Sequence, residues 1–471
     1  MKRWKCTVCG EIFEGDTPPV PCKVCGAGIN AFIELPIDEG ETTYWRCAVC
    51  GQIFEGSEPP TPCPVCGAGR SAFTKEIKKT ALFHKDTNDE FVLIGGGVAS
   101  LEAAKAIRER NATAKIKLIC GEGIIPFSRP SLSDVVGDGL SFEAVCLEDY
   151  SYYNAKNIEL ITDAMAVDIN KTEKYVELAN GKKLAYTKLL IATGAAPFVP
   201  LPKTENGLPI KTLRSFADAQ YLFSNAKNKR IIVVGGGILG VEAALSLYER
   251  GCTVSIVELG VRLMSVQADE YVSRVLQARL EELGISVYTA VSVEEIELDK
   301  VKLSSGVSIS TDMILASVGV RSETGLARKA GLLVNRGIVI SSDMRTDDKN
   351  IFAAGDCAEL NKKVTGLYAA AAEGGRVAGC VMAGEDMQYT IAPPATSFEG
   401  ASLSLFSTGV LEAEHTSTLV YTSKDDKIYK KLIFKNNNLI GAILLGDTDG
   451  AANIIGAVNN NMPFNEAKEQ L

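Results

Sequence analysis

Eight of the thirteen cysteines lie close to the N-terminus and form four C-x-x-C pairs. They fall into two groups, each with twelve residues between its two pairs: Cys6, Cys9, Cys22 and Cys25, then Cys47, Cys50, Cys63 and Cys66. Two facing C-x-x-C turns place four sulfurs in a tetrahedron, the geometry of zinc or of a single iron. Redox dithiols or disulfides are the alternative, but paired cysteines in a chain without an export signal favour metal ligands.

These cysteines belong to an internal repeat with an offset of 41 residues. The sequence WKCTVCGEIFEGDTPPVPCKVCGAG, which starts at Trp4, returns as WRCAVCGQIFEGSEPPTPCPVCGAG from Trp45. A module of this length could scarcely bury a sufficient core unless a metal held it together. The repeat therefore predicts two small metal-binding domains.

The two repeats resemble rubredoxins in their Trp-x-Cys-x-x-Cys-Gly start, their proline-rich approach and the C-P-x-C pair that ends at Cys66. The twelve-residue gap is similar to that of the compact rubredoxin-like domain of rubrerythrins. Lys23 stands where the proline of C-P-x-C would be, which leaves the ligands of the first repeat intact. The resemblance implies one iron ion in each repeat, two in all, cycling between ferric and ferrous states. The cysteines alone are equally compatible with zinc.

Two glycine turns, each between an apolar strand and a helical pattern, indicate a second kind of chemistry. The G-x-G-x-x-G/A positions are held by Gly95, Gly97 and Ser100 in FVLIGGGVASLEAA, and by Gly235, Gly237 and Gly240 in IIVVGGGILGVEAA. Such glycines let a pyrophosphate approach backbone amides at a helix N-terminus, whose partial positive charge attracts it. Two turns of this kind, each in strand–turn–helix context, predict two dinucleotide-binding folds.

An acidic residue after the second strand of such a fold receives the adenosine ribose hydroxyls. Glu258 holds this position in the second fold, and its carboxylate would repel a 2′-phosphate. NADH is therefore favoured over NADPH, although Arg262 nearby could accept that phosphate. In the first fold Cys120 stands at the matching position, so Glu122 is the candidate ribose ligand; a solvated loop carboxylate is the alternative interpretation.

Two further motifs follow the glycine turns in a fixed order: LLIATGAAPFVPLP, with Thr193 and Gly194, and IFAAGDCAEL, with Gly355 and Asp356. Over residues 90–390 this order resembles the FAD-dependent pyridine nucleotide–disulfide oxidoreductase superfamily. The resemblance implies that FAD and NADH bind, and that Asp356 hydrogen-bonds the ribityl chain of FAD.

The segment IPFSRPSLS, with Arg129 and Pro130, is similar to the branch that reduces rubredoxins and ferredoxins. This branch includes the NADH:rubredoxin oxidoreductases and the flavin part of nitrite reductases. Glu242 in GVEAA matches a family glutamate near the nicotinamide and is the catalytic candidate, with a satisfied helix carboxylate as the alternative. Some relatives pair that glutamate with a lysine after R-P-x-L-S, but this chain has Asp134 there.

The elements that position these motifs predict an α/β fold. It would contain two Rossmann-like FAD- and NAD-binding domains of glutathione-reductase type, two metal ribbons and a small α+β domain. In the last part we expect strands at SLSLFSTG and KKLIFKNNNLIGAILLGD, a hairpin turn at residues 436–438 and a helix from Gly450. The predicted domains are 1–37 and 38–78 (rubredoxin-like), 79–205 (FAD-binding, first part), 206–320 (NAD(P)H-binding), 321–390 (FAD-binding, second part) and 391–471 (C-terminal).

The charge and hydropathy of the chain argue against some classes of binding partner. The net charge is −9 and basic residues form no run, which argues against nucleic acid and against an anionic membrane surface. No segment reaches the ~20 apolar residues that a membrane span requires. The opening MKRWKCTVCG predicts no signal peptide, so we expect a cytoplasmic protein.

Disulfide reductases of the superfamily keep a cysteine pair beside the flavin. Here the other five cysteines stand singly: Cys120, Cys146, Cys252, Cys357 and Cys380. We therefore expect hydride transfer from NADH to FAD and then single-electron transfer to the two irons. By resemblance, the downstream acceptor is a rubrerythrin, a flavodiiron protein or a superoxide reductase, in the oxidative stress defence of an anaerobe.

Another enzyme class remains as the alternative. It is an NADH oxidase or peroxidase in which structural zinc ribbons serve as protein-docking modules. The missing cysteine for a sulfenic-acid cycle weighs against the peroxidase.

Overall fold

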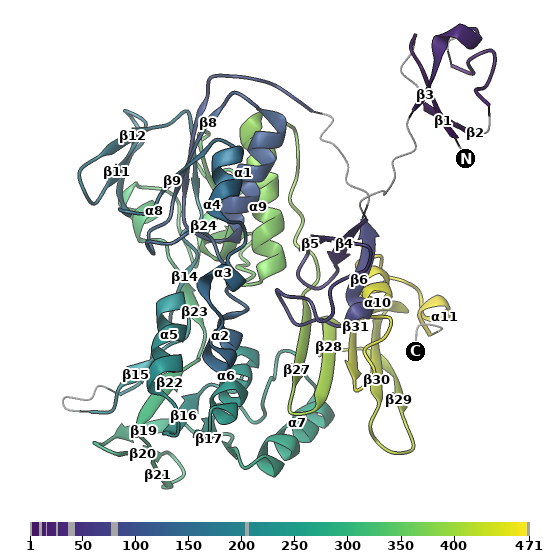
Figure 1. Ribbon diagram of the computed structural model, residues 1–471. Coiled ribbons are helices and arrows are strands. Elements are labelled where there is room, and N and C mark those ends of the chain that lie inside the picture. The colour runs from purple at the N-terminus through teal and green to yellow at the C-terminus, as the bar shows by residue number, and fades with distance from the viewer. Residues whose placement is uncertain are drawn as a thin grey trace.

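The computed structural model describes residues 2–8, 12–15, 17–24, 27–35, 43–76, 83–202 and 207–468. Two predicted metal ligands, Cys9 and Cys25, lie outside these residues. We call the described part of residues 2–35 module one and residues 43–76 module two. Figure 1 shows both modules in purple, the first apart from the other domains and the second against the yellow C-terminal domain.

The two modules share one fold, so the repeat in sequence is a repeat in structure. In each, the first strand is central and pairs antiparallel with the other two, in the orders β2-β1-β3 and β5-β4-β6. An edge-to-face phenylalanine pair lies in each module, with ring centroids 5.9 Å and 6.0 Å apart. The elements are β1 (Lys2–Cys6), β2 (Ile12–Gly15), the 3-10 helix η1 (Ile29–Ala31) and β3 (Phe32–Leu35), then β4 (Tyr44–Cys47), β5 (Ile53–Glu55), η2 (Arg70–Ala72) and β6 (Phe73–Glu76).

The first glycine turn lies in a five-stranded parallel sheet with the order β25-β13-β7-β8-β9. Its central strands read as unbroken apolar runs because helices and loops bury both faces. β25 returns to this sheet after the whole second unit has been completed, so the second unit is an insertion. The elements are β7 (Glu90–Ile94), α1 (Val98–Arg110), β8 (Lys115–Ile119), α2 (Leu132–Asp138), α3 (Phe142–Val145), α4 (Tyr150–Ala155), β9 (Ile158–Ile161), β13 (Lys188–Ile191) and β25 (Ile351–Ala353).

Helix α9 (Tyr368–Ala383) packs along α1, as Figure 1 shows. Glycines permit this close approach: a Cβ on Gly375 would lie 2.1 Å from the carbonyl oxygen of Ala99, and one on Gly379 would lie 2.4 Å from that of Ala103. Gly375 and Gly379 of α9 are therefore required by the close approach of α1.

The inserted unit carries the second glycine turn in another five-stranded parallel sheet, with the order β15-β22-β16-β17-β18. A short antiparallel ribbon of β14 and β23 links it to the first unit. The elements are β14 (Ala195–Pro197), β15 (Ile210–Lys211), α5 (Phe216–Asn225), β16 (Arg230–Val234), α6 (Ile238–Glu249), β17 (Thr253–Val257), α7 (Glu270–Glu282), β18 (Ser286–Tyr288), β22 (Met313–Ala316) and β23 (Val320–Ser322).

The C-terminal domain is a five-stranded antiparallel sheet, in the order β27-β28-β31-β30-β29, with a covering helix. The predicted hairpin is present: Asn436 and Asn437 both have positive φ, 52° and 65°, as a tight turn between twisted strands requires. The elements are β27 (Ala395–Gly400), β28 (Leu403–Gly409), β29 (Ser417–Thr422), β30 (Tyr429–Lys435), β31 (Asn438–Leu445), α10 (Ala451–Asn459) and α11 (Phe464–Ala467).

The remaining elements are short. They are β10 (Ala166–Asn170), β11 (Tyr175–Leu178), β12 (Lys183–Ala185), β19 (Val293–Ile296), β20 (Lys300–Leu303), β21 (Ser308–Ser310), α8 (Gly325–Lys329), β24 (Ile338–Ile340), η3 (Gly355–Cys357) and β26 (Ala358–Leu360). The predicted α/β architecture with metal ribbons and an α+β C-terminal domain is confirmed. Among the described residues, no helix is long and apolar enough to cross a membrane.

Candidate functional site

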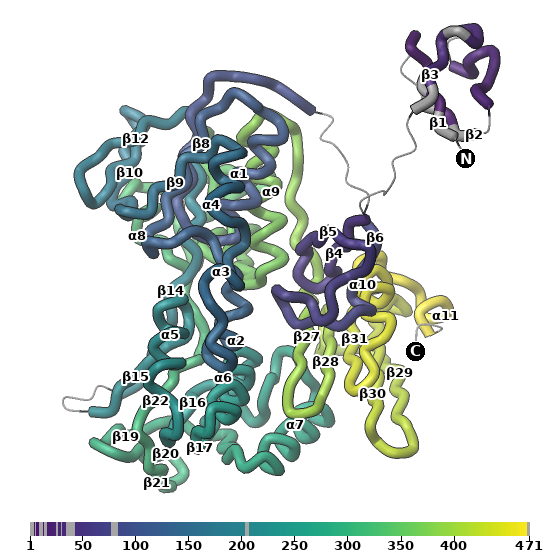
Figure 2. Tube along the Cα trace, viewed as in Figure 1, coloured from purple at the N-terminus to yellow at the C-terminus, as the bar shows by residue number. Residues whose placement is uncertain are grey.

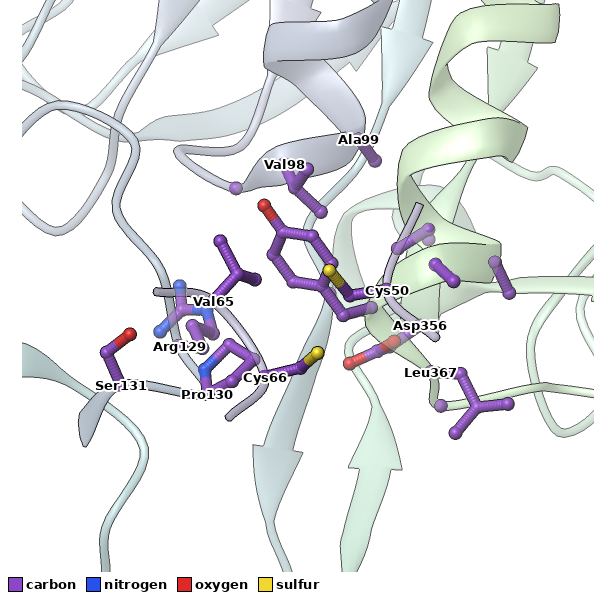
Figure 3. Close-up of a pocket in the computed structure, with 18 of the residues that line it drawn as sticks. Cys50, Val65, Cys66, Val98, Ala99, Arg129, Pro130, Ser131, Asp356 and Leu367 are labelled. Carbon is purple, nitrogen blue, oxygen red and sulfur yellow. The ribbon is translucent and has the colours of Figure 1, made fainter. Parts of the chain in front are cut away.

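A large cavity, about 1570 Å³ in volume, lies where the first glycine turn, the inserted unit, the C-terminal domain and module two meet. It brings together most of the site residues predicted from sequence. Figure 3 shows Cys50 and Cys66 of module two close to Arg129, Pro130 and Asp356 of the first unit. The predicted residues that line it are Cys47, Cys50, Cys63, Cys66, Gly95, Gly97, Glu122, Arg129, Pro130, Thr193, Gly194, Glu242, Gly355 and Asp356.

The first glycine turn forms a cradle at the N-terminus of α1. Gly95 has a φ of +129°, and a Cβ there would lie 2.0 Å from the carbonyl oxygen of Ala192, so only glycine fits. Gly97 is the N-cap residue of α1 and no side-chain atom fills the space beside it. Ser100 is buried in the first turn of α1, and its hydroxyl has no hydrogen-bond partner in the structure. An open cradle of amides at a helix N-terminus suits a pyrophosphate.

Glu122 and Arg129 form an ion pair at the cavity wall. Arg129 also donates a hydrogen bond to the carbonyl oxygen of Arg214 (2.7 Å), and its guanidinium lies over the ring of Phe127. Glu122 is thus in place for a ribose, but its carboxylate already has a cationic partner. Glu122 is also an exposed residue in a loop, so the alternative interpretation, a solvated loop carboxylate, stays open.

Asp356 is held by a residue that the sequence did not single out. The guanidinium of Arg214 donates to Oδ2 of Asp356 (3.1 Å), and the hydroxyl of Ser322 donates to the carbonyl oxygen of Asp356 (2.7 Å). Thr193 donates to the carbonyl oxygen of Glu323 (2.6 Å). Arg214 lies in the loop before α5 and belongs to no motif, so only its tertiary contact identifies it.

The second glycine turn repeats the geometry of the first. A Cβ on Gly235 (φ +113°) would lie 2.2 Å from the carbonyl oxygen of Ser317, and one on Gly240 would lie 2.0 Å from that of Gly235. Gly237 is the N-cap residue of α6. These glycines are not among the residues lining the cavity, which the inserted unit reaches through Ile238, Leu239 and Glu242 of α6.

The carboxylate of Glu258 accepts hydrogen bonds from the backbone amides of Gly236 and Gly260. It therefore caps the second glycine turn at the end of β17, where the sequence predicted it. Arg262, the residue that could have accepted a 2′-phosphate, is ion-paired with Glu412 of the C-terminal domain.

Glu242 faces the cavity in an acidic surrounding. Burial, and to a lesser degree the charge of Asp134, raises the pKa of the Glu242 carboxyl to about 8. Burial also raises the pKa of Asp134, with further contributions from Asp138 and Glu249. Asp134 thus places a second carboxylate near Glu242.

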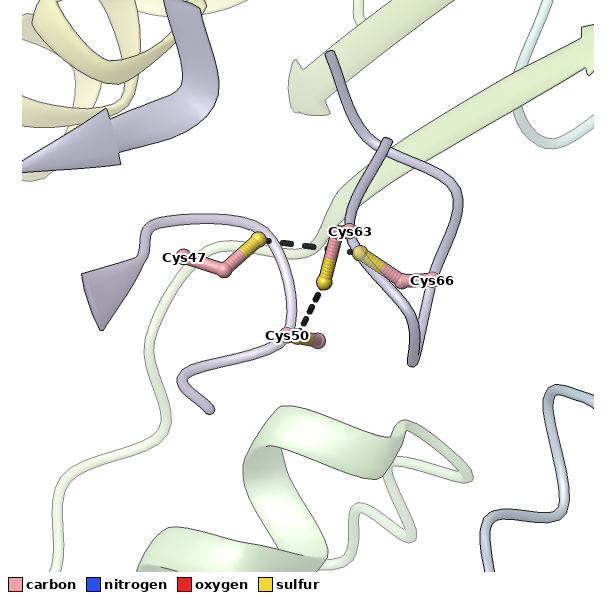
Figure 4. Close-up of side chains that lie close together, drawn as sticks. All are labelled: Cys47, Cys50, Cys63 and Cys66. Atoms are coloured by element: carbon pink, nitrogen blue, oxygen red, sulfur yellow. Dashed lines mark hydrogen bonds between the residues drawn. The ribbon is translucent and has the colours of Figure 1, made fainter. Parts of the chain in front are cut away.

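The cysteines of module two form a metal-binding geometry. The four sulfur atoms of Cys47, Cys50, Cys63 and Cys66 all lie within 4.8 Å of one another. Two close pairs, Cys47–Cys66 at 3.6 Å and Cys50–Cys63 at 3.7 Å, are drawn in Figure 4. The donor set fits a tetrahedral zinc or iron ion.

In module one, Cys6 and Cys22 are buried, as their counterparts Cys47 and Cys63 are. Because Cys9 and Cys25 are outside the described residues, the geometry of this predicted site is not described further.

Module two is joined to three parts of the molecule. Ser131 donates a hydrogen bond to the carbonyl oxygen of Pro64 (3.2 Å), and Ser71 donates to that of Thr448 (3.0 Å). The hydroxyl of Tyr368, the first residue of α9, donates to Oε1 of Gln52 (3.4 Å). A common hydrophobic core also joins it to the C-terminal domain and includes Val49, Val65, Ala68, Phe73, Phe406, Phe434, Leu444 and Ile454. Figure 2 shows the trace of module two beside that of the C-terminal domain.

The five single cysteines are unsuited to thiol chemistry. Burial raises the pKa of all five, which keeps them as thiols at neutral pH. Cys357, beside Asp356, is fully buried and its thiol donates to the carbonyl oxygen of Ile191. Every cysteine among the described residues is free of a disulfide.

The chain matches three protein families. Residues 89–375 match the pyridine nucleotide-disulphide oxidoreductases. Residues 394–462 match the rubredoxin NAD+ reductase C-terminal domain, and residues 4–33 and 45–74 match the rubrerythrin rubredoxin-like domain.

Individual relatives cover most of the chain. The NAD(P)H nitrite reductase of Bacillus subtilis is 29% identical over 392 residues, which cover 81% of this chain and 48% of the relative. The NADH-rubredoxin oxidoreductase of Clostridium acetobutylicum is 29% identical over 377 residues, covering 80% and 96%. The crystal structure of an NADH:rubredoxin oxidoreductase from Clostridium acetobutylicum is similar with a TM-score of 0.67 and 27% identity, covering 81% of this chain and 97% of that one. The chain spans about half the length of the Bacillus subtilis relatives it matches.

Proposed function

Because this chain belongs to the pyridine nucleotide-disulphide oxidoreductase family, we propose that it is an NADH:rubredoxin oxidoreductase that carries its own acceptors. In this proposal hydride passes from NADH to FAD, and single electrons then pass to the tetracysteine centres. One observation carries it: the four cysteines of module two line the same cavity as the first glycine turn and Asp356. A relative named NADH-rubredoxin oxidoreductase supports it.

We assign FAD to the first unit. Gly95, Gly97 and Ser100 would hold its pyrophosphate at the N-terminus of α1, with the free Ser100 hydroxyl inside that turn. Asp356, oriented by Arg214, would accept a hydrogen bond from the ribityl chain. Thr193, Gly194, Gly355, Glu122, Arg129 and Pro130 complete the cofactor-binding set. Flavin supplies the exchange between a two-electron hydride donor and one-electron metal centres.

We assign NADH to the inserted unit. Gly235, Gly237 and Gly240 would hold its pyrophosphate, and Glu258 would receive the adenosine ribose. The ion pair of Arg262 with Glu412 supports NADH over NADPH, because it leaves Arg262 engaged by another carboxylate. Glu242 would lie near the nicotinamide, and its raised pKa would keep it neutral there.

We assign iron, not zinc, to the cysteine sites, because zinc has no redox chemistry with which to accept an electron. The proposed sites are two, one in each module. A rubrerythrin, a flavodiiron protein or a superoxide reductase would take the electrons onward in the cytoplasm.

The test uses the full-length protein after iron reconstitution, with metal content measured. Anaerobic NADH should bleach the ferric–thiolate absorbance, and it should not do so in the same protein freed of FAD. Sites that fill only with zinc, or ferric sites that NADH leaves oxidised, would contradict the proposal. They would favour an NADH oxidase with structural ribbons instead.

A further inference from the structure

The two modules have almost the same sequence but different surroundings. Val49 and Val65, each just before the second cysteine of its pair, are 7% and 8% exposed. The residues at the same positions of module one, Val8 and Val24, are 68% and 63% exposed. The face that carries the C-x-x-C turns is therefore covered in module two and open in module one.

This face of module two is covered by the side of the molecule that we assign to FAD. Val49 and Val65 line the cavity together with Pro130, Asp356 and Tyr368. The metal site thus faces the wall that we assign to FAD, with no intervening domain. The four cysteines of module two themselves line this cavity.

Module two is also fixed in this position. Its apolar residues and those of β28, β30, β31 and α10 form a single core, in which Phe73 and Phe406 take part. Ser131 and Tyr368 donate hydrogen bonds to module two, and Ser71 of module two donates one to Thr448 of the C-terminal domain. For module one to take this place, that core would have to open, which would expose its apolar surface to water.

We infer that electrons move through the chain in a fixed order, from the flavin site to the iron of module two and then to that of module one. This inference rests on the proposed function and adds the sequence of transfers. Oxidation of one NADH to NAD+ gives up two electrons and one proton in total. Each ferric iron accepts one electron and becomes ferrous, and the proton leaves to solvent. The first electron continues to module one, and the second stays on module two.

The chain offers matched variants for a test, because each residue of one module has a counterpart 41 positions away. Cys6→Ser removes a ligand from module one, and Cys47→Ser removes the equivalent ligand from module two. Both proteins are reconstituted with iron and FAD and mixed anaerobically with NADH. Flavin and ferric–thiolate absorbance are followed separately by stopped flow, and the remaining ferric iron is quantified by electron paramagnetic resonance.

We expect Cys6→Ser to reduce its one remaining iron at the wild-type rate. Cys47→Ser should reduce its flavin normally but reduce the iron of module one at least ten-fold more slowly. Reduction of that iron at the wild-type rate would overturn the order while leaving the proposed function intact. If NADH reduces the flavin but neither iron in the wild-type protein, the proposed function itself fails.

A second pair of variants keeps all eight cysteines. Val65→Lys places a charge in the covered face, and Val24→Lys places one in the open face. We expect Val65→Lys to slow the reduction of both irons, whereas Val24→Lys should leave the reduction of module two unchanged. Equal reduction rates for both irons in the two variants would contradict the order.

Discussion

The hydroxyl of Tyr368 donates a hydrogen bond to Oε1 of Gln52 across 3.4 Å. Tyr368 begins α9, and its ring packs against both the core of the first unit and the core shared by module two and the C-terminal domain. Burial, with the nearby cysteines of module two, raises its pKa well above the ordinary value, so the phenol stays protonated and can donate. One side chain thus joins the helix beside the proposed flavin site to the metal module.

Replacing Tyr368 should separate flavin reduction from metal reduction. Tyr368→Phe loses one hydrogen bond, about 1 kcal/mol, and should change little. Tyr368→Ala leaves a void that typically costs ~3–5 kcal/mol and should loosen the contact with module two. In Tyr368→Ala we expect NADH to reduce the flavin at the wild-type rate and the iron more slowly than in the wild-type protein, both measured by stopped-flow absorbance. Tyr186→Ala, at a buried tyrosine away from the cavity lining, is the control; an equal effect there would indicate general destabilisation.

Val65→Lys should destabilise the protein far more than Val24→Lys. Val65 is buried in the core that module two shares with the C-terminal domain. The variant therefore loses about 1.5–3 kcal/mol of apolar burial, and it also places a charged ammonium group in an apolar surrounding. Val24 is exposed, and surface substitutions usually stay within about 0.5 kcal/mol. Thermal unfolding of the iron-loaded proteins measures the difference. Equal transition temperatures would show that module two is not held where the structure has it.

Asp356→Ala should weaken FAD binding at least ten-fold, about 1.4 kcal/mol, because it removes the proposed ribityl acceptor and leaves Arg214 without its carboxylate. Titration of the apoprotein with FAD, followed by flavin fluorescence, measures the loss. Asp312→Ala breaks a comparable ion pair, with Arg230, on the surface of the inserted unit. It should leave FAD affinity unchanged; a parallel loss would assign the effect to folding.

Glu412→Gln should raise kcat/KM for NADPH several-fold. The substitution releases Arg262 from its ion pair, so that the guanidinium becomes available to a 2′-phosphate. The ratio of kcat/KM for NADPH and NADH is the measurement, and the value for NADH should stay within about two-fold. Glu414→Gln, an exposed neighbour on the same loop, is the matched control. No change in the ratio would mean that Glu258 alone sets the preference.

Glu242 should make the stability of the protein freed of FAD and nucleotide fall as pH rises from about 4.5 to about 8. Its pKa is about 8 in the folded protein against an ordinary 4.5, so in this range the folded state holds a proton that the unfolded chain releases. The upper limit is ~5 kcal/mol, at 1.36 kcal/mol per pH unit. Urea unfolding at several pH values tests this. Glu242→Gln should remove the dependence, and Asp134→Asn should narrow it; an unchanged slope in Glu242→Gln would contradict the assignment.

The local features of this protein could be predicted from sequence because they are short-range. The repeated ribbons follow from cysteine, glycine and phenylalanine spacing within about forty residues, and both glycine turns follow from the glycine spacing between an apolar strand and a helical pattern. The turn at Asn436 and Asn437 needs only two residues that tolerate a positive φ. Each of these is determined by neighbours along the chain.

The contacts that shape the site join residues that lie far apart in the sequence. Arg214 reaches Asp356 across 142 positions of sequence, and Tyr368 reaches Gln52 across 316. No pattern along the chain marks such a pair, because its approach depends on the return of β25 to the first sheet and on the docking of module two.

The sequence by itself determined two metal-binding repeats and two dinucleotide folds. Only the tertiary structure decided that the repeats are not equivalent. Val24 and Val65 occupy the same place in the same motif, yet one is open to solvent and the other is buried. The physical reason is that apolar burial depends on what packs against a face, and of the described parts of the two modules only module two meets the C-terminal sheet and the cavity wall.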